Sequence, residues 1–459
     1  MAYLTHTAVE LYRATGRQSY ADDAIRLGRW LLQVQEQRFL DGIPITGYFY
    51  EDAKRTRIIH EFHNGFGECG LFAFKALCEA LPDHPDWIEW YAALLINSEF
   101  YCRQGVAASS PYDVIPCAVW RRSDIDAPLA VDRHDFGAEP SPLYPTMPTP
   151  ELIRTQMLKM FDDSTYLGEN YRLRVFPLWH NNIQHGASVV HLSKTAGLMA
   201  AAQVRNRRDL AELAARQLQW VLGANPFSRS IIYGEGYDYW QNFTVSLPSI
   251  VGGMSLGMNS YHGDSPAWPN NALFPYKEQW IFSTCRVMLN LAHVGIPARV
   301  SGSAPSGATF LEKRTDKAVR VDRGNFDLNL AAGEYTITYG DMVKQTALVD
   351  GTSYQLDLDP RRAIEMDLSA ASPAAGGLVK ITAAVRGAGA HTIEVRTFNA
   401  TVDQNQLKLD LGSKGKRTLD WTLRISDPEK PWVMVVIPDN RMADLRELFG
   451  TSQNLPKVS

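Results

Sequence analysis

A change of hydrophobic period near residue 300 constrains this chain more than any other feature. Before it, apolar residues recur every three or four positions, as in Leu4, Ala8 and Leu11, which is the period of an amphipathic helix. After it, apolar and polar residues alternate, as in 334–339, which is the period of a half-buried strand. The chain has 459 residues, more than a single hydrophobic core usually supports. We therefore expect a helical domain followed by separate β modules.

The helical part is expected to consist of helical hairpins. The expected helices cover 4–12, 20–34, 69–81, 87–101, 187–204, 208–222 and 277–294. Between them lie long stretches rich in Pro, Gly and aromatic residues, at 105–150, 163–184 and 223–276. Loops of this length usually carry function, and their aromatic content argues against disorder. We interpret them as the walls of a cleft.

The β part is expected to form two sandwiches. Strand-like runs occur at 318–321, 334–339, 354–358, 363–368, 378–383, 391–396 and 432–437, with Gly- and Pro-marked turns between them. The second module resembles an immunoglobulin-like sandwich in the spacing of its strands. The expected domains are 1–298 helical, 299–360 a small β-sandwich, 361–445 the immunoglobulin-like module, and 446–459 a C-terminal tail. From about residue 440 we expect helix, then a polar end.

Composition and charge exclude several classes of function. The formal net charge of -4 gives no broad basic field for nucleic acid or an anionic membrane. The first residues contain neither a basic stretch followed by an apolar one nor a run long enough to span a bilayer. The five cysteines form no CxxC pair and no metal-finger spacing. We therefore expect no nucleic-acid or membrane partner, no bound metal and no redox cofactor.

A turn after the helix expected at 208–222 carries a family resemblance. Residues 210–236 end this helix in Val-Leu-Gly-Ala-Asn-Pro at 221–226 and continue into an aromatic loop containing Gly234 and Gly236. This stretch resembles glycoside hydrolase family nine, in which a late helix ends in Leu-Gly-x-Asn-Pro before a loop with Gly-x-Gly. The stretch 270–278 is also similar, because the family places its catalytic acid, a Glu, just before its last barrel helix. The resemblance covers roughly residues 1–295.

The resemblance implies an (α/α)6 toroid whose active site lies at one mouth of the ring and hydrolyses a polysaccharide or oligosaccharide with inversion. It makes Glu278 the general acid. The family takes its general base from an Asp-x-x-Asp motif near the start of the domain, and no such motif precedes the first hairpin expected here. Either the first hairpins are missing, or the base comes from elsewhere, or hydrolysis has been lost. Family members are typically exported; without a missing N-terminal segment, the chain would be cytoplasmic.

Inverting hydrolysis needs a protonated carboxylic acid and a second carboxylate about 6.5–9.5 Å away that activates water. Glu278 lies beside Tyr276 and Trp280 in the sequence, where partial burial would raise its pKa. The alternative is a helix-start Glu favoured by the helix dipole. The candidates for the base are Glu68, Asp124 and Asp126. Each of them could instead be a solvated charge or a charge that holds a loop together.

Polar and aromatic residues of the long stretches are candidates for binding the sugar. The substrate-binding candidates are His63, His180, Asn181, His185, Arg229, Tyr233, Tyr237, Tyr239, Trp240 and Tyr276. Imidazole and amide groups can hydrogen-bond to sugar hydroxyls. The guanidinium group of Arg229 could also bind the carboxylate of an acidic sugar. Alternatively, the amide side chains cap loops and the aromatic side chains pack in the core. Arg229 could instead bind the last carbonyls of the preceding helix.

Two further functions fit the same pattern. A polysaccharide lyase would use a Tyr or His to abstract a proton and an Asn or Arg to neutralise a uronic acid. In that case the residues that matter more than Glu278 are His63, Asn64, His180, Asn181, His185 and Tyr276. A glycan-binding protein that has lost its base would bind the sugar without turnover.

Overall fold

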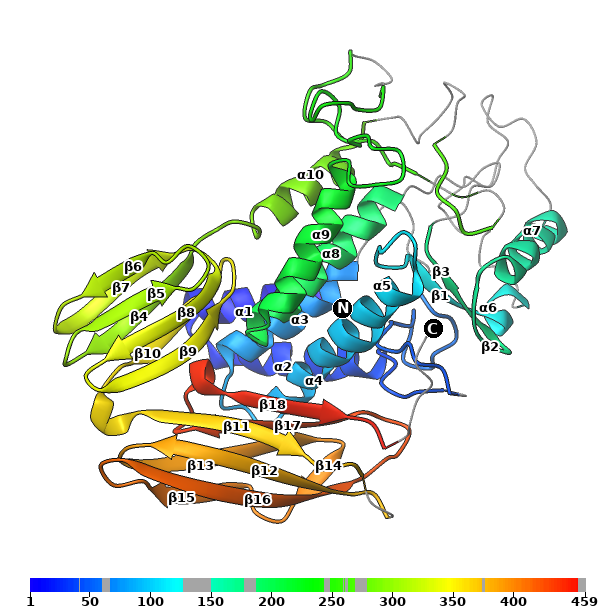
Figure 1. Cartoon of the computed structure of the whole chain (residues 1–459). Coiled ribbons are helices and arrows are strands. Elements are labelled where there is room, and N and C mark those ends of the chain that lie inside the picture. Colours follow the sequence, from blue (N-terminus) through cyan, green and yellow to red (C-terminus); the bar gives the residue numbers. More distant parts are fainter. Residues whose placement is uncertain are drawn as a thin grey trace.

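A computed structural model describes residues 1–40, 42–59, 67–126, 150–176, 187–242, 248–258, 260, 263–268, 279–373 and 376–452. Within these residues the chain combines helices with small, mainly antiparallel sheets, which makes it a mixed α+β protein. Figure 1 shows the helices gathered together, with one β-sandwich beside them and a second beneath them. None of the helices in these ranges is both long and apolar enough to cross a lipid bilayer.

Most helices lie where the amphipathic pattern predicts them. These are α1 (Ala2–Thr15), α2 (Gln18–Gln33), α3 (Gly67–Ala80), α4 (Trp87–Ile96), α8 (Ala187–Val204), α9 (Arg208–Val221) and α10 (Ile281–Leu291). α4 continues through a π-helical turn, Asn97–Arg103, into α5 (Gln104–Ala108). Gly16 ends α1 in a left-handed conformation, and its N–H donates to the carbonyl of Tyr12 over 2.8 Å.

Two of the stretches predicted as loops contain regular structure. These elements are β1 (Ala118–Arg121), α6 (Arg122–Asp126), β2 (Thr165–Gly168) and β3 (Tyr171–Arg174). A further helix, α7 (Pro150–Asp162), lies between the two stretches, where the sequence pattern predicted no element. The strands form an antiparallel sheet in the order β1-β3-β2. Each strand has four residues, which is too short for a period of two to stand out in the sequence. The prediction of continuous loop was therefore wrong here.

The first sandwich follows α10 directly. Its strands are β4 (Ala298–Ala304), β5 (Ala308–Glu312), β6 (Ala318–Val321), β7 (Gly324–Leu330), β8 (Gly333–Tyr339), β9 (Met342–Leu348) and β10 (Ser353–Asp357). They form two sheets, β10-β4-β7 and β6-β5-β8-β9. Val300 and Leu356 from one sheet share a buried core with Phe310 and Ile337 from the other, as expected for alternating strands.

The second sandwich contains β11 (Ile364–Ala370), β12 (Leu378–Gly387), β13 (Ala390–Phe398), β14 (Ala400–Val402), β15 (Gln406–Asp410), β16 (Gly415–Ile425), β17 (Trp432–Pro438) and β18 (Arg446–Gly450). Its sheets have the orders β11-β12-β16-β14 and β15-β13-β17-β18. The helix expected after residue 440 was wrong. Apart from a 3-10 turn at Met442–Asp444, the chain there is a strand, because β18 pairs antiparallel with β17.

β17 joins the second sandwich to the helices, because it is buried on both faces. Trp432, Met434 and Val436 lie in the sandwich core. Val433, Val435 and Ile437 point the other way and pack in a core that also contains residues of α3 and α4. Figure 1 shows β17 and β18 lying directly beneath the helices. The toroid and the domain limits given by the sequence stay predictions.

Candidate functional site

The turn after α9 is built by one buried amide side chain. Gly223 has a φ of 121°, which favours glycine, and Asn225 follows it. The Asn225 amide donates to the carbonyl oxygens of Trp220, over 2.9 Å, and Arg229, over 2.7 Å. Its own oxygen accepts the N–H of Phe227 over 3.1 Å. Asn225 therefore fixes the direction in which the chain leaves the helix.

The chain then forms a closed aromatic loop over residues 229–240. The Arg229 guanidinium pairs with the Asp238 carboxylate over 2.7 Å, and the Ser230 N–H donates to the carbonyl of Asp238 over 2.9 Å. Tyr237 stands at the tip with its side chain fully exposed. Tyr233 and Tyr239 meet edge to face with ring centroids 5.2 Å apart. Tyr237 is therefore open to a ligand, and Arg229 already has a carboxylate partner.

Trp240 is packed inside this region. Its ring stacks on Trp268 at a centroid distance of 4.5 Å and an angle of 15°. The Arg229 guanidinium carbon lies 4.9 Å from the same ring centroid, and Phe227 meets the ring edge-on. These neighbours leave little of the ring for a sugar, so the geometry favours a packing role for Trp240.

The aromatic loop is hydrogen-bonded to the segment that holds the start of α10. The N–H of Tyr233 donates to the carbonyl of Gly253 over 3.0 Å, and the N–H of Gly252 donates back to the carbonyl of Tyr233 over 2.9 Å. The Gln279 amide donates to the same Gly253 carbonyl over 3.3 Å and accepts the N–H of Ile250 over 2.6 Å. Gln279 follows Glu278 in the sequence.

Glu68 lies in the first turn of α3 and is buried. One of its oxygens pairs with an Arg286 nitrogen of α10 over 2.6 Å. The other accepts the hydroxyl of Ser193 on α8. With both oxygens engaged, Glu68 holds α3 against α8 and α10.

Asp124 in α6 is also buried and engaged at both oxygens. One oxygen accepts the Arg121 Nε over 2.9 Å, and the other accepts the N–H of Ile58 over 3.2 Å. Burial raises the pKa of Asp124, and the bonds from Arg121 and Ile58 oppose that rise. Asp124 thus holds the 55–58 segment against α6. The side chain of Asp126 lies outside the described residues.

Six of the predicted site residues lie outside the described residues altogether. They are Glu278, Tyr276, His63, His180, Asn181 and His185. Their roles stay predictions.

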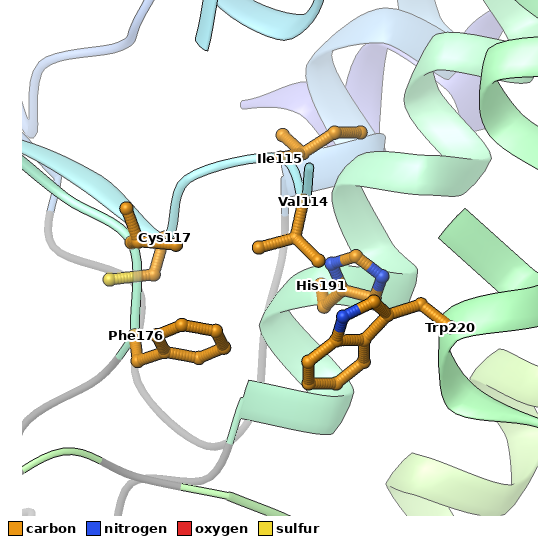
Figure 2. A pocket seen from close by; sticks show the side chains of 7 residues that line it. Val114, Ile115, Cys117, Phe176, His191 and Trp220 are labelled. Atoms are coloured by element: carbon orange, nitrogen blue, oxygen red, sulfur yellow. The ribbon is translucent and has the colours of Figure 1, made fainter. Parts of the chain in front are cut away.

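A small cavity lies between the end of β3, α8 and α9 (Figure 2). It is lined by Val114, Ile115, Cys117, Val175, Phe176, His191 and Trp220. The cavity has room for about one water molecule, far less than a sugar ring needs. Burial lowers the pKa of His191 to about 4, so its ring is neutral at pH 7, and its Nε2 meets the carbonyl of Gln217 over 3.1 Å.

Comparisons with known proteins gave little overlap. No protein-family model matches the sequence, and no curated protein matches it. Among solved structures, the cellulase Cel9M of C. cellulolyticum shares 14% identity, with a TM-score of 0.20 over 50% of this chain and 49% of that one. The chain thus spans about half the length of that structure, and a TM-score this low supports no inference about fold or activity.

Three residues that shape the candidate site were missed in the sequence. Asp238 lies within the aromatic stretch, and its spacing of nine from Arg229 gives no helical or strand signal. Gln279 directly follows the candidate acid, and its amide connects two segments that the sequence separates by 29 residues. Arg286 lies in the middle of an otherwise uncharged helix. A lone charge in such a helix was the one available signal of a buried ion pair.

Proposed function

We propose that the helical part of this protein binds a glycan on the 229–240 loop and hydrolyses a glycosidic bond with inversion, with Glu278 as the general acid. The observation that supports this most is the hydrogen-bonded connection from Tyr233 through Gly253 to Gln279. The aromatic loop and the residue after Glu278 share one backbone carbonyl as their acceptor. In this proposal Glu278 meets the saccharide that the loop holds.

The loop offers the groups that sugars need. An exposed ring such as Tyr237 can stack on the apolar face of a pyranose. The Asp238 carboxylate can accept hydrogen bonds from sugar hydroxyls, and the Arg229 guanidinium can donate hydrogen bonds to them. Because these two side chains neutralise each other over 2.7 Å, the loop does not need an acidic sugar to balance Arg229. Glu278 would then protonate the leaving oxygen.

The mechanism also needs a carboxylate that acts as the general base. A base must present a carboxylate oxygen to water, but Glu68 and Asp124 are both buried, and each is paired with an arginine. We assign Glu68 the role of holding α10, and Asp124 that of holding its loop. Asp126 remains our proposed base.

The engaged carboxylates favour a second candidate function, glycan binding without turnover. In that case the loop would bind the saccharide as before, and no second carboxylate would activate water. The lyase alternative draws its acid, base and amide groups from residues outside the described ranges, so no described contact supports it.

A panel of neutral and acidic polysaccharides separates these functions. We expect the protein to bind at least one polysaccharide and to release reducing ends from it without an ultraviolet-absorbing product. Binding with no release would select the second candidate. An unsaturated product absorbing in the ultraviolet would select a lyase. Neither binding nor release from any polysaccharide would overturn the proposal.

A further inference from the structure

The outer face of α10 is apolar and exposed along its whole length. Its exposed residues include Ile281, Cys285 and Met288, with Ala292 directly after the helix. Their spacings of four, three and four match the a/d seam of a paired helix. The inner face, with Ser283, Val287 and Asn290, is buried against the protein. The outer face therefore has the pattern of a second contact surface.

This outer face carries no charge. Between residues 281 and 292 the sequence contains one charged residue, Arg286. Its side chain pairs with the buried Glu68 over 2.6 Å and is itself mostly buried. Of the five cysteines, all in the described part of the chain, Cys285 alone is exposed. Contiguous apolar surface of this kind usually marks a site of association.

α1 extends the apolar surface beside α10. The ring of Phe72 on α3 lies between the two, with its centroid 6.4 Å from that of His6 and 6.1 Å from that of His293. His293 lies two residues after α10, so α1 and the end of α10 both lie beside Phe72. The exposed large side chains of this surface are Tyr3, Leu4 and Leu11 on α1 and Ile281, Phe282, Met288 and Leu291 on α10.

The size of this surface suits a stable protein contact. Ile281 is 73% and Met288 63% exposed, and the other five side chains are between 40% and 57% exposed. Taking roughly 200 Å² for each large side chain, the exposed part amounts to roughly 800 Å². One partner in a standard interface contributes about 800 Å².

We propose that this surface binds a second copy of this chain, with α10 packed antiparallel against its symmetry mate about a two-fold axis. In that register Ile281 faces the partner's Ala292, and Cys285 faces the partner's Met288. Each large side chain thus meets a small one, which lets the two helices interdigitate. A two-fold contact brings the same surface from both copies together, and an uncharged seam meets itself without repulsion. This proposal does not depend on the proposed function.

The test uses the full chain and Cys285 as a reporter. Across the proposed axis, the two Cys285 residues lie about 4.5 Å apart along the helix direction, within reach of a short bis-maleimide. We expect a dimer by light scattering at micromolar concentration and a cross-linked dimer that Cys285→Ser abolishes. Met288→Glu should weaken the dimer at least tenfold. Val343→Glu, at an exposed position on β9, is the matched control and should leave the dimer intact.

Two results would overturn the proposal. One is a single-chain mass at every concentration, which would assign the surface to a different protein. The other is a dimer that Met288→Glu does not weaken and that the bis-maleimide does not trap. Thermal unfolding of each variant checks that it is folded. If Met288→Glu does not fold, Ile281→Lys can be used instead, because it places a charge on the same apolar face of α10.

Discussion

The backbone N–H of Tyr233 donates to the carbonyl oxygen of Gly253 over 3.0 Å. The same oxygen accepts the Gln279 side chain over 3.3 Å, so one peptide group connects the aromatic loop to the start of α10. The loop that follows the turn at 221–226 and the side chain of Gln279 are thereby brought into one network.

Replacing Asn225 by Ala should loosen the aromatic loop. The change removes two donated bonds and one accepted bond of a buried side chain, and the carbonyls left behind lose their partner. We expect a loss of about 1–3 kcal/mol in the free energy of unfolding, measured by urea denaturation, together with weaker glycan binding. Asn225→Asp keeps the acceptor for the Phe227 N–H but turns a carboxylate oxygen toward the two carbonyls, so it should be at least as damaging. An unchanged urea midpoint for Asn225→Ala would contradict this role.

Replacing Tyr237 by Ala should weaken glycan binding without changing stability. The Tyr237 side chain is fully exposed, so its loss costs no packing. A sugar stacked on it would lose about 0.5–1.5 kcal/mol, which corresponds to a roughly two- to tenfold weaker affinity, measured by isothermal titration calorimetry. Tyr166→Ala, at an exposed tyrosine on β2, is the control and should bind like the unmodified protein. Equal affinities for the two variants would remove Tyr237 from the binding surface.

The Arg205–Glu447 pair should make the protein sensitive to acid. Arg205 at the end of α8 binds both oxygens of Glu447 on β18, over 2.7 and 3.2 Å. Burial alone would raise the pKa of Glu447, but Arg205 and Tyr91 hold it below its ordinary value of 4.5. The unfolded chain therefore binds more protons as the pH falls below about 4.5, and this part of the stability is lost there.

Glu447→Gln tests the same pair at neutral pH. The change removes one of the two carboxylates that pair with the buried Arg205, and Glu99 still pairs with it over 2.8 Å. We therefore expect a loss of about 1.5–3 kcal/mol in the free energy of unfolding and a flatter pH dependence of stability below 4.5. Unfolding by urea at several pH values measures both. Glu212→Gln, at an exposed position on α9, serves as the control. A variant as stable as the unmodified protein would show that the pair does not hold β18 to the helices.

His191 should add a second pH dependence at higher pH. Burial lowers its pKa from 6.5 to about 4, so the folded protein keeps this ring neutral where the unfolded chain protonates it. Its contribution is complete above pH 6.5 and is lost as the pH falls from 6.5 to 4, by about 3 kcal/mol in total. In His191→Leu, the free energy of unfolding measured with urea should no longer fall between pH 6.5 and pH 4 through this residue. If the free energy of unfolding of His191→Leu depends on pH as strongly as that of the unmodified protein, His191 is not the group responsible.

Seven of the helices were predictable because apolar residues recur through them at helical spacing, whereas α6 and α7 were not predicted. β18 was not, because the short run Arg446–Gly450 has no period of its own and becomes a strand by pairing with β17. The same limit applies to the site. The aromatic loop was evident from its composition, but Trp240 packs on Trp268, which lies 28 residues away. Sequence spacing therefore could not separate Trp240, which is packed, from Tyr237, which is exposed.

The Glu278→Gln variant shows whether Glu278 is the general acid. Reducing-end release from the polysaccharide that binds best is measured for the unmodified protein, for Glu278→Gln, and for Glu151→Gln at an exposed position on α7. We expect that Glu278→Gln still binds the polysaccharide but releases at least a hundredfold fewer reducing ends, whereas Glu151→Gln matches the unmodified protein. Undiminished release by Glu278→Gln would show that Glu278 is not the general acid.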